Sequence, residues 1–123
     1  SSLPPGMTSR AASLIAVAGS AGEATRRAKE AGLENIEVEC DTIEQVKEAL
    51  DAGAARLLLD NMAPETLRET VAVTGGRVPL EASGGVTLEN IAGIAATGVD
   101  FISVGAITHS APAVDIGLDL AGD

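Results

Sequence analysis

The sequence predicts an α/β protein built as a partial (β/α) barrel of about four strand–helix units, half of a TIM-like barrel. Short apolar patterns typical of strands alternate with helical patterns along most of the 123 residues. The predicted strands end at intervals of about 22 positions, the size of one strand–helix unit. These ends are Glu39, Asp60, Ser83 and Gly105. The strands also alternate between apolar and polar residues, unlike strands covered by helices on both faces.

Residues 1–13 are expected to form a flexible leader, because they are rich in Ser, Pro and Gly and have no hydrophobic period. One domain is then expected over residues 14–123, since a chain of this length has room for one. Its first helix is predicted after Ser20, which fits a capping box with Glu23, and Gly32 ends that helix.

Two strand–helix units are predicted next. The strand Ile36–Cys40 precedes a helix that begins after Thr42, and Thr42 and Gln45 make a second capping box. The strand Arg56–Asp60 precedes a helix that begins at Pro64, because proline is tolerated in the first helical turn. Both strands are therefore expected to be parallel members of one sheet.

A third unit begins with a strand pattern from Val78 to Ser83. The helix predicted after it carries the apolar residues Leu88, Ile91, Ile94 and Ala95. Gly98 is expected to end that helix, and Phe101–Gly105 reads as the last strand of the barrel. Residues 111–120 alternate weakly, which indicates a short terminal strand.

The alternation assigns the two faces of the sheet. The apolar positions, expected to face the helices, are Val38, Cys40, Leu57, Leu59, Leu80, Ala82, Ile102 and Val104. The opposite positions are Glu37, Glu39, Arg56, Leu58, Asp60, Glu81, Ser83, Ser103 and Gly105. We expect Cys40 to be a small core residue. Glu37, Arg56 and Glu81 are expected to form a buried salt network inside the barrel.

A complete barrel needs roughly eight units, so four units predict half of one. Half a barrel leaves two open sheet edges and an uncovered polar face. We therefore expect the chain either to be a fragment or to pair with another chain, which predicts a homo-oligomer.

The composition excludes several classes of partner. The net charge of −10 repels nucleic acid and anionic membranes. A single cysteine excludes an internal disulfide, and no apolar run approaches the length of a membrane span. We therefore expect a cytoplasmic protein that binds small molecules.

The segment Ser83-Gly84-Gly85 is a candidate anion site, and Gly105-Ala106 follows the next strand. Glycine lacks the Cβ that would keep a phosphate from the backbone, and a helix after the turn would offer free N–H groups. A Gly-Gly turn is equally common as an ordinary loop between a strand and a helix. His109, the only histidine, would reach a phosphate there, or it is structural.

Glu39 and Asp60 end neighbouring predicted strands and would face one rim. Two carboxylates there can hold Mg²⁺, accept hydrogen bonds from sugar hydroxyls or stabilise a cationic transition state. Alternatively, they cap the helices that follow. The residues alone leave these possibilities open.

Four segments resemble the carboxyl-terminal half of the quinolinate phosphoribosyltransferase family. They are Ile36–Thr42, Leu57–Met62, Leu80–Val86 and Ile102–Pro112, in that order, and the resemblance runs from about Ile15 to Leu120. It implies transfer of phosphoribosyl from phosphoribosyl pyrophosphate to quinolinate with Mg²⁺. The implied products are nicotinate mononucleotide, pyrophosphate and carbon dioxide, within NAD biosynthesis.

The resemblance also implies roles for particular residues. Glu39 and Asp60 would contact the ribose and the metal. The phosphate would be held by Ser83, Gly84, Gly85, Gly105 and Ala106, with His109 close by. Fixed carboxylates suit this chemistry, because breaking the bond at the anomeric carbon builds positive charge on the sugar.

The sequence departs from the family at its amino-terminal side. Family members carry a Lys-Asp-Asn-His segment where this chain has Ala11-Ala12-Ser13-Leu14, and the family's first half has no counterpart here. We therefore expect no turnover by this chain alone. Two alternatives stay open: a related phosphosugar enzyme, such as the molybdenum-transport-associated relatives, or a non-catalytic phosphate-binding or oligomerisation module.

Overall fold

The computed structural model describes residues 12–15 and 21–114. Six strands form one sheet in the sequential order β1 to β6. They are β1 (Ala12–Ile15), β2 (Ile36–Cys40), β3 (Arg56–Asp60), β4 (Leu80–Ser83), β5 (Phe101–Val104) and β6 (Ile107–Ser110). The first five are parallel, and β6 returns antiparallel to β5.

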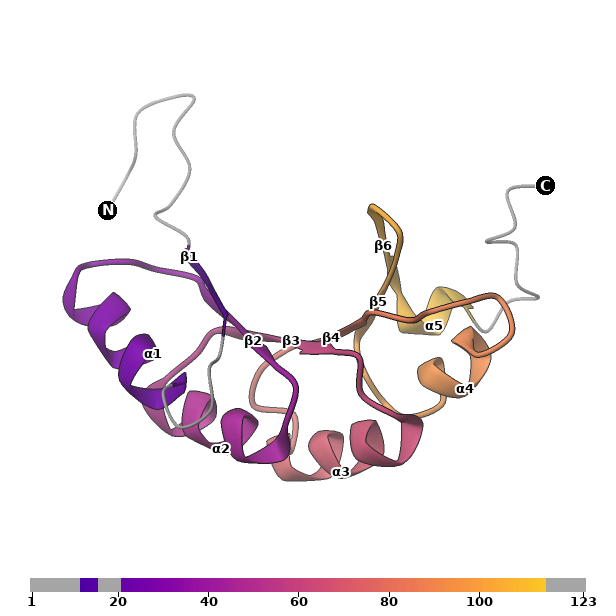
Figure 1. Cartoon of the computed structure of the whole chain (residues 1–123), viewed down its shortest axis with the longest axis horizontal. Coiled ribbons are helices and arrows are strands. Elements are labelled where there is room, and N and C mark those ends of the chain that lie inside the picture. The colour runs from indigo at the N-terminus through magenta and orange to yellow at the C-terminus, as the bar shows by residue number, and fades with distance from the viewer. Residues whose placement is uncertain (1–11, 16–20, 115–123) are drawn as a thin grey trace.

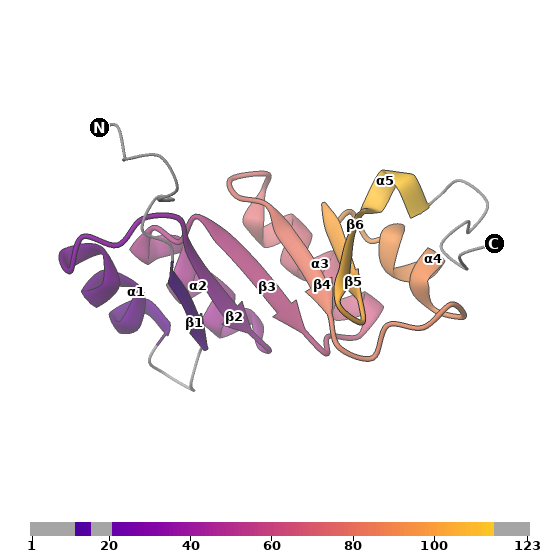
Figure 2. The same cartoon turned by 90° about the horizontal axis from the view of Figure 1, so that it is seen from above.

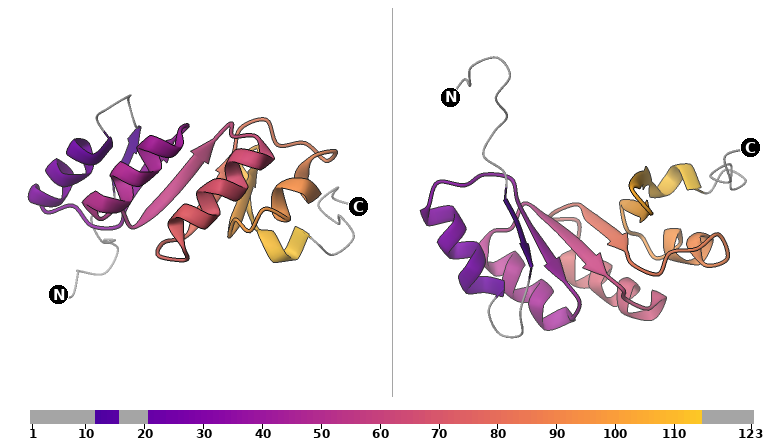
Figure 3. Two further views of the ribbon diagram at one scale, coloured as in Figure 1. Left: turned by 90° about the horizontal axis from the view of Figure 1, so that it is seen from below. Right: turned by 45° about the horizontal axis from the view of Figure 1, so that its top comes forward.

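Helices cover one face of this sheet. They are α1 (Ala21–Glu30), α2 (Ile43–Ala52), α3 (Pro64–Thr74), α4 (Ile91–Ala95) and α5 (Ala111–Val114). Figure 1 shows α1 to α4 side by side below the sheet, and Figure 2 shows the strands in front of α2 and α3. Seen from below, in Figure 3, the same helices lie in front of the strands. Among the described residues, no helix covers the opposite face.

The sequence signals at α2 and α3 are confirmed. Thr42 Oγ1 accepts a hydrogen bond from the Gln45 amide at 3.2 Å, and Gln45 Oε1 accepts one from the Thr42 amide at 3.2 Å. This reciprocal pair satisfies two amides that would otherwise lack partners at the helix start. Pro64 occupies the first turn of α3. The predicted cap at Ser20 lies outside the described residues.

The predicted division of the sheet into two faces is also confirmed. Seven of the eight apolar positions predicted to face the helices are buried, with Val38, Leu57, Leu59 and Ile102 completely so, and the eighth, Val104, is partly buried. Residues from all the longer helices join them in one core cluster. Because burial of apolar side chains is the main favourable term in folding, this face holds the strands in place. The opposite, polar face of the sheet carries the candidate functional site.

Four expectations about the elements are corrected. A strand, β1, begins at Ala12 within the predicted leader and pairs with β2, and a second unpredicted strand, β6, follows β5. Helix α4 begins at Ile91, and Leu88 before it is 52% exposed rather than in the core. The terminal strand expected from residue 111 is a helix at 111–114, where Pro112 is tolerated in the first turn. Residues 115–120 lie outside the described residues.

The sheet stays open, as the half-barrel prediction expects. Strands β1 and β6 stand at its two ends and do not pair with each other. The β5–β6 hairpin rises from the uncovered face (Figure 1). The described part of the chain is therefore a curved, open α/β layer with all its parallel strands ending at one rim.

Candidate functional site

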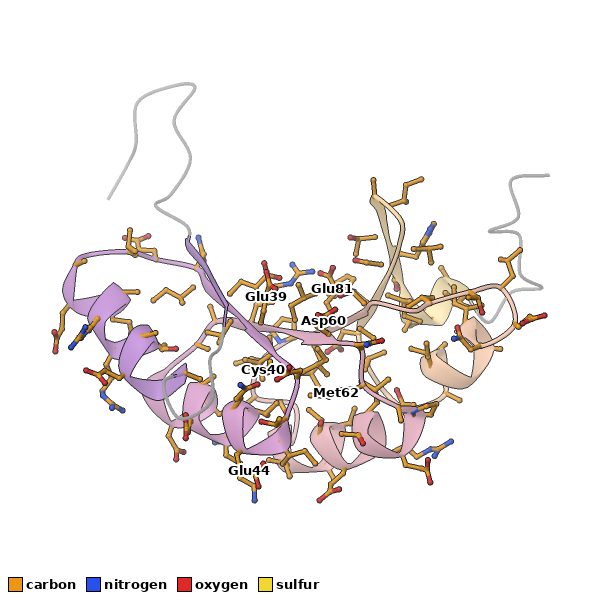
Figure 4. The ribbon with its side chains drawn as sticks, in the orientation of Figure 1. Glu39, Cys40, Glu44, Asp60, Met62 and Glu81 are labelled. Atoms are coloured by element: carbon orange, nitrogen blue, oxygen red, sulfur yellow. The ribbon has the colours of Figure 1, made fainter. Side chains whose placement is uncertain are left out.

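The two predicted acidic residues lie on the uncovered face of neighbouring strands. Glu39 pairs with Leu58 in the parallel register, so Asp60 lies one further step along that face. Glu39 is half-buried and Asp60 is exposed. Figure 4 shows Glu39 above the sheet, on the side away from the helices, with Asp60 on the next strand. The two carboxylates therefore face one rim, as expected.

The turn after β4 is packed directly against Asp60. A Cβ atom added at Gly84 would lie 2.6 Å from Asp60 Oδ1 and 3.0 Å from the Asn61 nitrogen. The Asn61 amide donates to the Ser83 carbonyl at 2.8 Å, which joins the ends of β3 and β4. Only glycine fits so close to the carboxylate, and the positive φ of Gly84, 79°, also favours it.

The loop from Gly85 to α4 is held by Asn90. Its Nδ2 donates to the Gly85 carbonyl at 2.8 Å, and its Oδ1 accepts from the Thr87 amide at 2.7 Å. Asn90 is also the N-cap of α4, and it lines the same pocket as Gly84 and Gly85. Because α4 has only five residues, its dipole adds little to an anion site, and the helix-terminus part of the predicted site stays a prediction.

A pocket of about 270 Å³ lies between the loops after β3 and β4. Asn61, Gly84, Gly85 and Asn90 supply its polar lining. Sequence reasoning missed the two asparagines. Asn61 directly follows the Asp60 strand end and has a φ of 60°, a conformation that asparagine tolerates better than most residues. Its position after a strand was the available signal.

The second predicted phosphate loop joins β5 to β6. Gly105 and Ala106 are exposed at this turn, and Gly105 has a φ of 61°. His109 pairs with Ile102 across the hairpin, whereas Thr108 pairs with Ser103. Directly opposed residues share a side of an antiparallel pair, so Thr108, rather than His109, lies on the polar side with Ser103. The role of His109 in binding stays a prediction.

The predicted salt network is present below the site. Arg56 Nη2 lies 2.5 Å from Glu81 Oε1, and Arg56 Nε lies 3.5 Å from Glu37 Oε2. Glu81 is only 9% exposed, and its other oxygen accepts from the Ser103 hydroxyl. The Arg56 guanidinium also lies over the Phe101 ring, 4.9 Å from its centroid. One cation thus joins four of the strands.

Burial raises the pKa of Glu37, and this effect outweighs the nearby Arg56 cation, which lowers it. The neighbouring carboxylates Glu81 and Glu39 raise the pKa further. Crowded acidic groups on a partly dehydrated face favour the protonated form of one of them. Glu37 therefore takes up a proton at a higher pH than an isolated glutamate does.

Cys40 is a buried core residue, as predicted, and burial raises the pKa of its thiol to about 12, with Asp41 and Glu48 adding to the rise. An unfolded chain ionises its thiol near pH 9. Because the folded pKa is higher, stability from this group is complete below pH 9 and is lost between about pH 9 and 12.

We therefore expect the free energy of unfolding to fall with rising pH above 9, more steeply in the wild-type chain than in Cys40→Ala. Denaturant titrations at several pH values measure both slopes. The thiol should also resist alkylation at pH 8 until denaturant is added. Equal slopes in the two proteins would contradict the buried, neutral thiol.

The carboxylates of Glu39 and Asp60 fit Mg²⁺ only if the substrate supplies further ligands. Among the described residues, no group of three or more His, Cys, Asp or Glu side chains could hold a metal ion. Mg²⁺, however, commonly keeps several waters and binds one or two carboxylates together with substrate phosphates. Glu39 and Asp60 fit a metal that arrives with such a substrate.

These features define a class of protein: an open half of a (β/α) barrel whose polar site lies at the carboxyl ends of its parallel strands, where barrel enzymes hold their reactive groups. Residues 10–119 match the model of the quinolinate phosphoribosyl transferase family, C-terminal domain. The chain belongs to this family.

Individual relatives and solved structures are consistent with this family match. A Bacillus subtilis protein named as a probable nicotinate-nucleotide pyrophosphorylase (carboxylating) is 44% identical over 108 residues, covering 86% of this chain and 37% of the relative. The human protein of that name is 39% identical over 111 residues, with the same coverage. The solved Ehrlichia chaffeensis nicotinate-nucleotide pyrophosphorylase superposes with a TM-score of 0.70 at 38% identity, covering 77% of this chain and 36% of that one. The solved nicotinate-nucleotide pyrophosphorylase from Francisella tularensis superposes with a TM-score of 0.71 at 32% identity, covering 81% of this chain and 38% of that one.

The chain thus spans little more than a third of the length of these relatives, 37% for the Bacillus subtilis protein. The match lies in the region that forms the half barrel. None of the helices in residues 21–114 is long and apolar enough to cross a membrane.

Proposed function

We propose that this chain is the phosphoribosyl-binding half of an enzyme that transfers phosphoribosyl from phosphoribosyl pyrophosphate to quinolinate. The products would be nicotinate mononucleotide, pyrophosphate and carbon dioxide. The names of the relatives support the reaction. The close approach of Gly84 to Asp60 carries the proposal. It places a carboxylate beside a backbone segment without side chains at the carboxyl ends of the parallel strands.

The proposed chemistry assigns separate tasks to the two parts of this rim. Glu39 and Asp60 stabilise the positive charge that develops on the ribose when its anomeric bond breaks. Ser83, Gly84 and Gly85, together with Gly105 and Ala106, hold the 5-phosphate by backbone amides. A fixed phosphate fixes the anomeric carbon, which lowers the entropic part of the barrier.

Mg²⁺ is the proposed cofactor, held by Asp60 and Glu39 together with the substrate. When bound, it neutralises charge on the pyrophosphate leaving group. The proposed partners are therefore small molecules. The open sheet edges at β1 and β6 support assembly with further polypeptide, and we propose a homo-oligomer.

A second candidate is a phosphate-binding module without chemistry. The ion pairs of Arg56 favour this second candidate. Arg56 is the one Lys or Arg side chain on the polar face of the described strands. Arg56 is already paired with Glu37 and Glu81. A dicarboxylate such as quinolinate would find no free arginine or lysine there among the described residues, whereas a phosphate held by amides needs none.

Titration calorimetry with phosphoribosyl pyrophosphate and Mg²⁺ tests the proposal. We expect the chain to bind and Asp60→Asn to lose at least about tenfold in affinity, because a charged contact is removed. Asp51→Asn, an exposed aspartate on α2, is the matched control and should bind as the wild type does.

When quinolinate is added to the chain together with phosphoribosyl pyrophosphate and Mg²⁺, we expect no release of pyrophosphate. Binding without turnover that survives Asp60→Asn would favour the non-catalytic module. The absence of heat in the wild-type chain would overturn both candidates.

A further inference from the structure

The sheet loosens between β4 and β5, at the level of the candidate site. Strands β3 and β4 stay paired up to Asp60 and Ser83, at their carboxyl ends. Pairing of β4 with β5 stops earlier, at Ala82 and Ile102. Among the described residues, β5 from Ser103 onward pairs with β6 alone. The hairpin thus leaves the sheet just before Gly105-Ala106, and Figure 1 shows it rising from the uncovered face.

Glu81 bridges this gap with its side chain. Its Oε1 accepts from Arg56 Nη2 on β3 at 2.5 Å, and its Oε2 accepts from the Ser103 hydroxyl on β5. The Ser103 and Thr108 hydroxyls lie 3.1 Å apart, which extends the chain to β6. Hydrogen bonds to a charged, largely buried group are about twice as strong as neutral ones. Glu81 is therefore well placed to hold the hairpin.

The bridge lies directly under the proposed phosphate loops. Glu81 precedes Ser83 by one step on the same face, and Ser103 precedes Gly105 in the same way. Arg56 begins the strand that ends at Asp60. A change in the Glu81–Ser103 contact would thus move the second loop relative to the first.

We propose that Glu81 is a positioning residue, which sets the separation of the Ser83–Gly85 turn and the Gly105-Ala106 turn through its contact with Ser103. This role deepens the proposed function and rests on it, since the two turns would hold one phosphate between them. Glu81 itself lies below the rim and touches no substrate in this arrangement.

The test is the affinity of the whole chain for inorganic phosphate, followed by the amide NMR signals of Gly84 and Gly105. Ser103→Ala removes the contact and leaves the Arg56–Glu81 pair intact. We expect it to weaken phosphate binding about tenfold, because ordering the released Gly105-Ala106 turn would then draw on the free energy of binding. Phosphate should still shift the Gly84 signal, whereas the Gly105 signal should no longer follow it.

Two further variants separate positioning from general stability. Ser103→Thr keeps the hydroxyl and should restore the affinity. Ser110→Ala makes the same chemical change on β6, and no hydrogen bond is described for its side chain, so it should bind like the wild type.

A double-mutant cycle with Glu81→Gln completes the test. If Glu81 acts through Ser103, the double variant should lose no more affinity than the larger single loss. Additive losses, or wild-type affinity in Ser103→Ala, would overturn the positioning role while leaving the phosphate site intact. A wild-type chain whose Gly84 and Gly105 signals ignore phosphate would overturn the phosphate site and, with it, this inference.

Discussion

Gly84→Ala is expected to abolish binding of phosphate and of phosphoribosyl pyrophosphate. The new Cβ would lie 2.6 Å from Asp60 Oδ1 and 3.0 Å from the Asn61 backbone nitrogen, so the carboxylate and the loop must both move. The positive φ costs about 1 kcal/mol, and the overpacking adds roughly 2 kcal/mol. The variant should therefore unfold at lower denaturant concentration and give no heat when titrated with phosphoribosyl pyrophosphate.

Gly76→Ala is a closely matched control, because Gly76 and Gly84 share a φ of 79° while nothing lies within 4 Å of a Cβ at Gly76. This control pays the backbone strain alone, about 1 kcal/mol, and should bind normally. The comparison isolates the close approach of Gly84 to Asp60. Normal binding by Gly84→Ala would show that the carboxylate and the turn do not form one site.

Arg56→Met is expected to lower the free energy of unfolding by about 2 kcal/mol at neutral pH. It leaves Glu81, 9% exposed, beside Glu37 without a cation. Removing one partner of a buried pair costs more than this, and the smaller figure reflects the partial exposure of the arginine side chain, 37%. Denaturant unfolding of both proteins measures the difference.

The pH dependence of this difference follows from Glu37. Arg56 lowers the pKa of Glu37 against the rise caused by burial, so its loss raises that pKa further. A carboxyl group whose pKa is raised by folding lowers the free energy of unfolding as the pH rises through that pKa. This loss of stability disappears at lower pH, where the group is protonated. The deficit of Arg56→Met should therefore shrink as the pH falls below the pKa of Glu37.

Arg27→Met provides the control for Arg56→Met. Arg27 pairs with Glu23 at 2.7 Å on the surface of α1, where the two side chains are 76% and 57% exposed. Such exposed pairs contribute less than about 0.5 kcal/mol. Equal losses in the two variants, or a deficit for Arg56→Met that does not change with pH, would contradict the role given to the Arg56 network.

Local patterns predicted much of the fold. The bounds of β2 and β3, the cap at Thr42 and the start of α3 at Pro64 follow from neighbouring residues, and the structure has them as predicted. The same holds for the salt network of Glu37, Arg56 and Glu81, since strand alternation puts these residues on one face.

Other features depend on partners far away in the sequence. Strand β1 is defined by its pairing with β2, and the short Ala12–Ile15 segment carries no local signal strong enough to find it. Helix α4 is short because Asn90 ties the preceding loop to Gly85, which a helical pattern including Leu88 does not reveal. Thr108 reaches the polar side only because the hairpin pairs it with Ser103.

By itself the sequence determined which residues of each strand are apolar, where the longer helices begin and which side chains end the strands, because these depend on spacings within one element. Tertiary structure alone decided that Gly84 lies against Asp60 and that Glu81 bridges Arg56 and Ser103. Those contacts depend on the register between strands and on where pairing stops, and neither is set by the residues of a single strand.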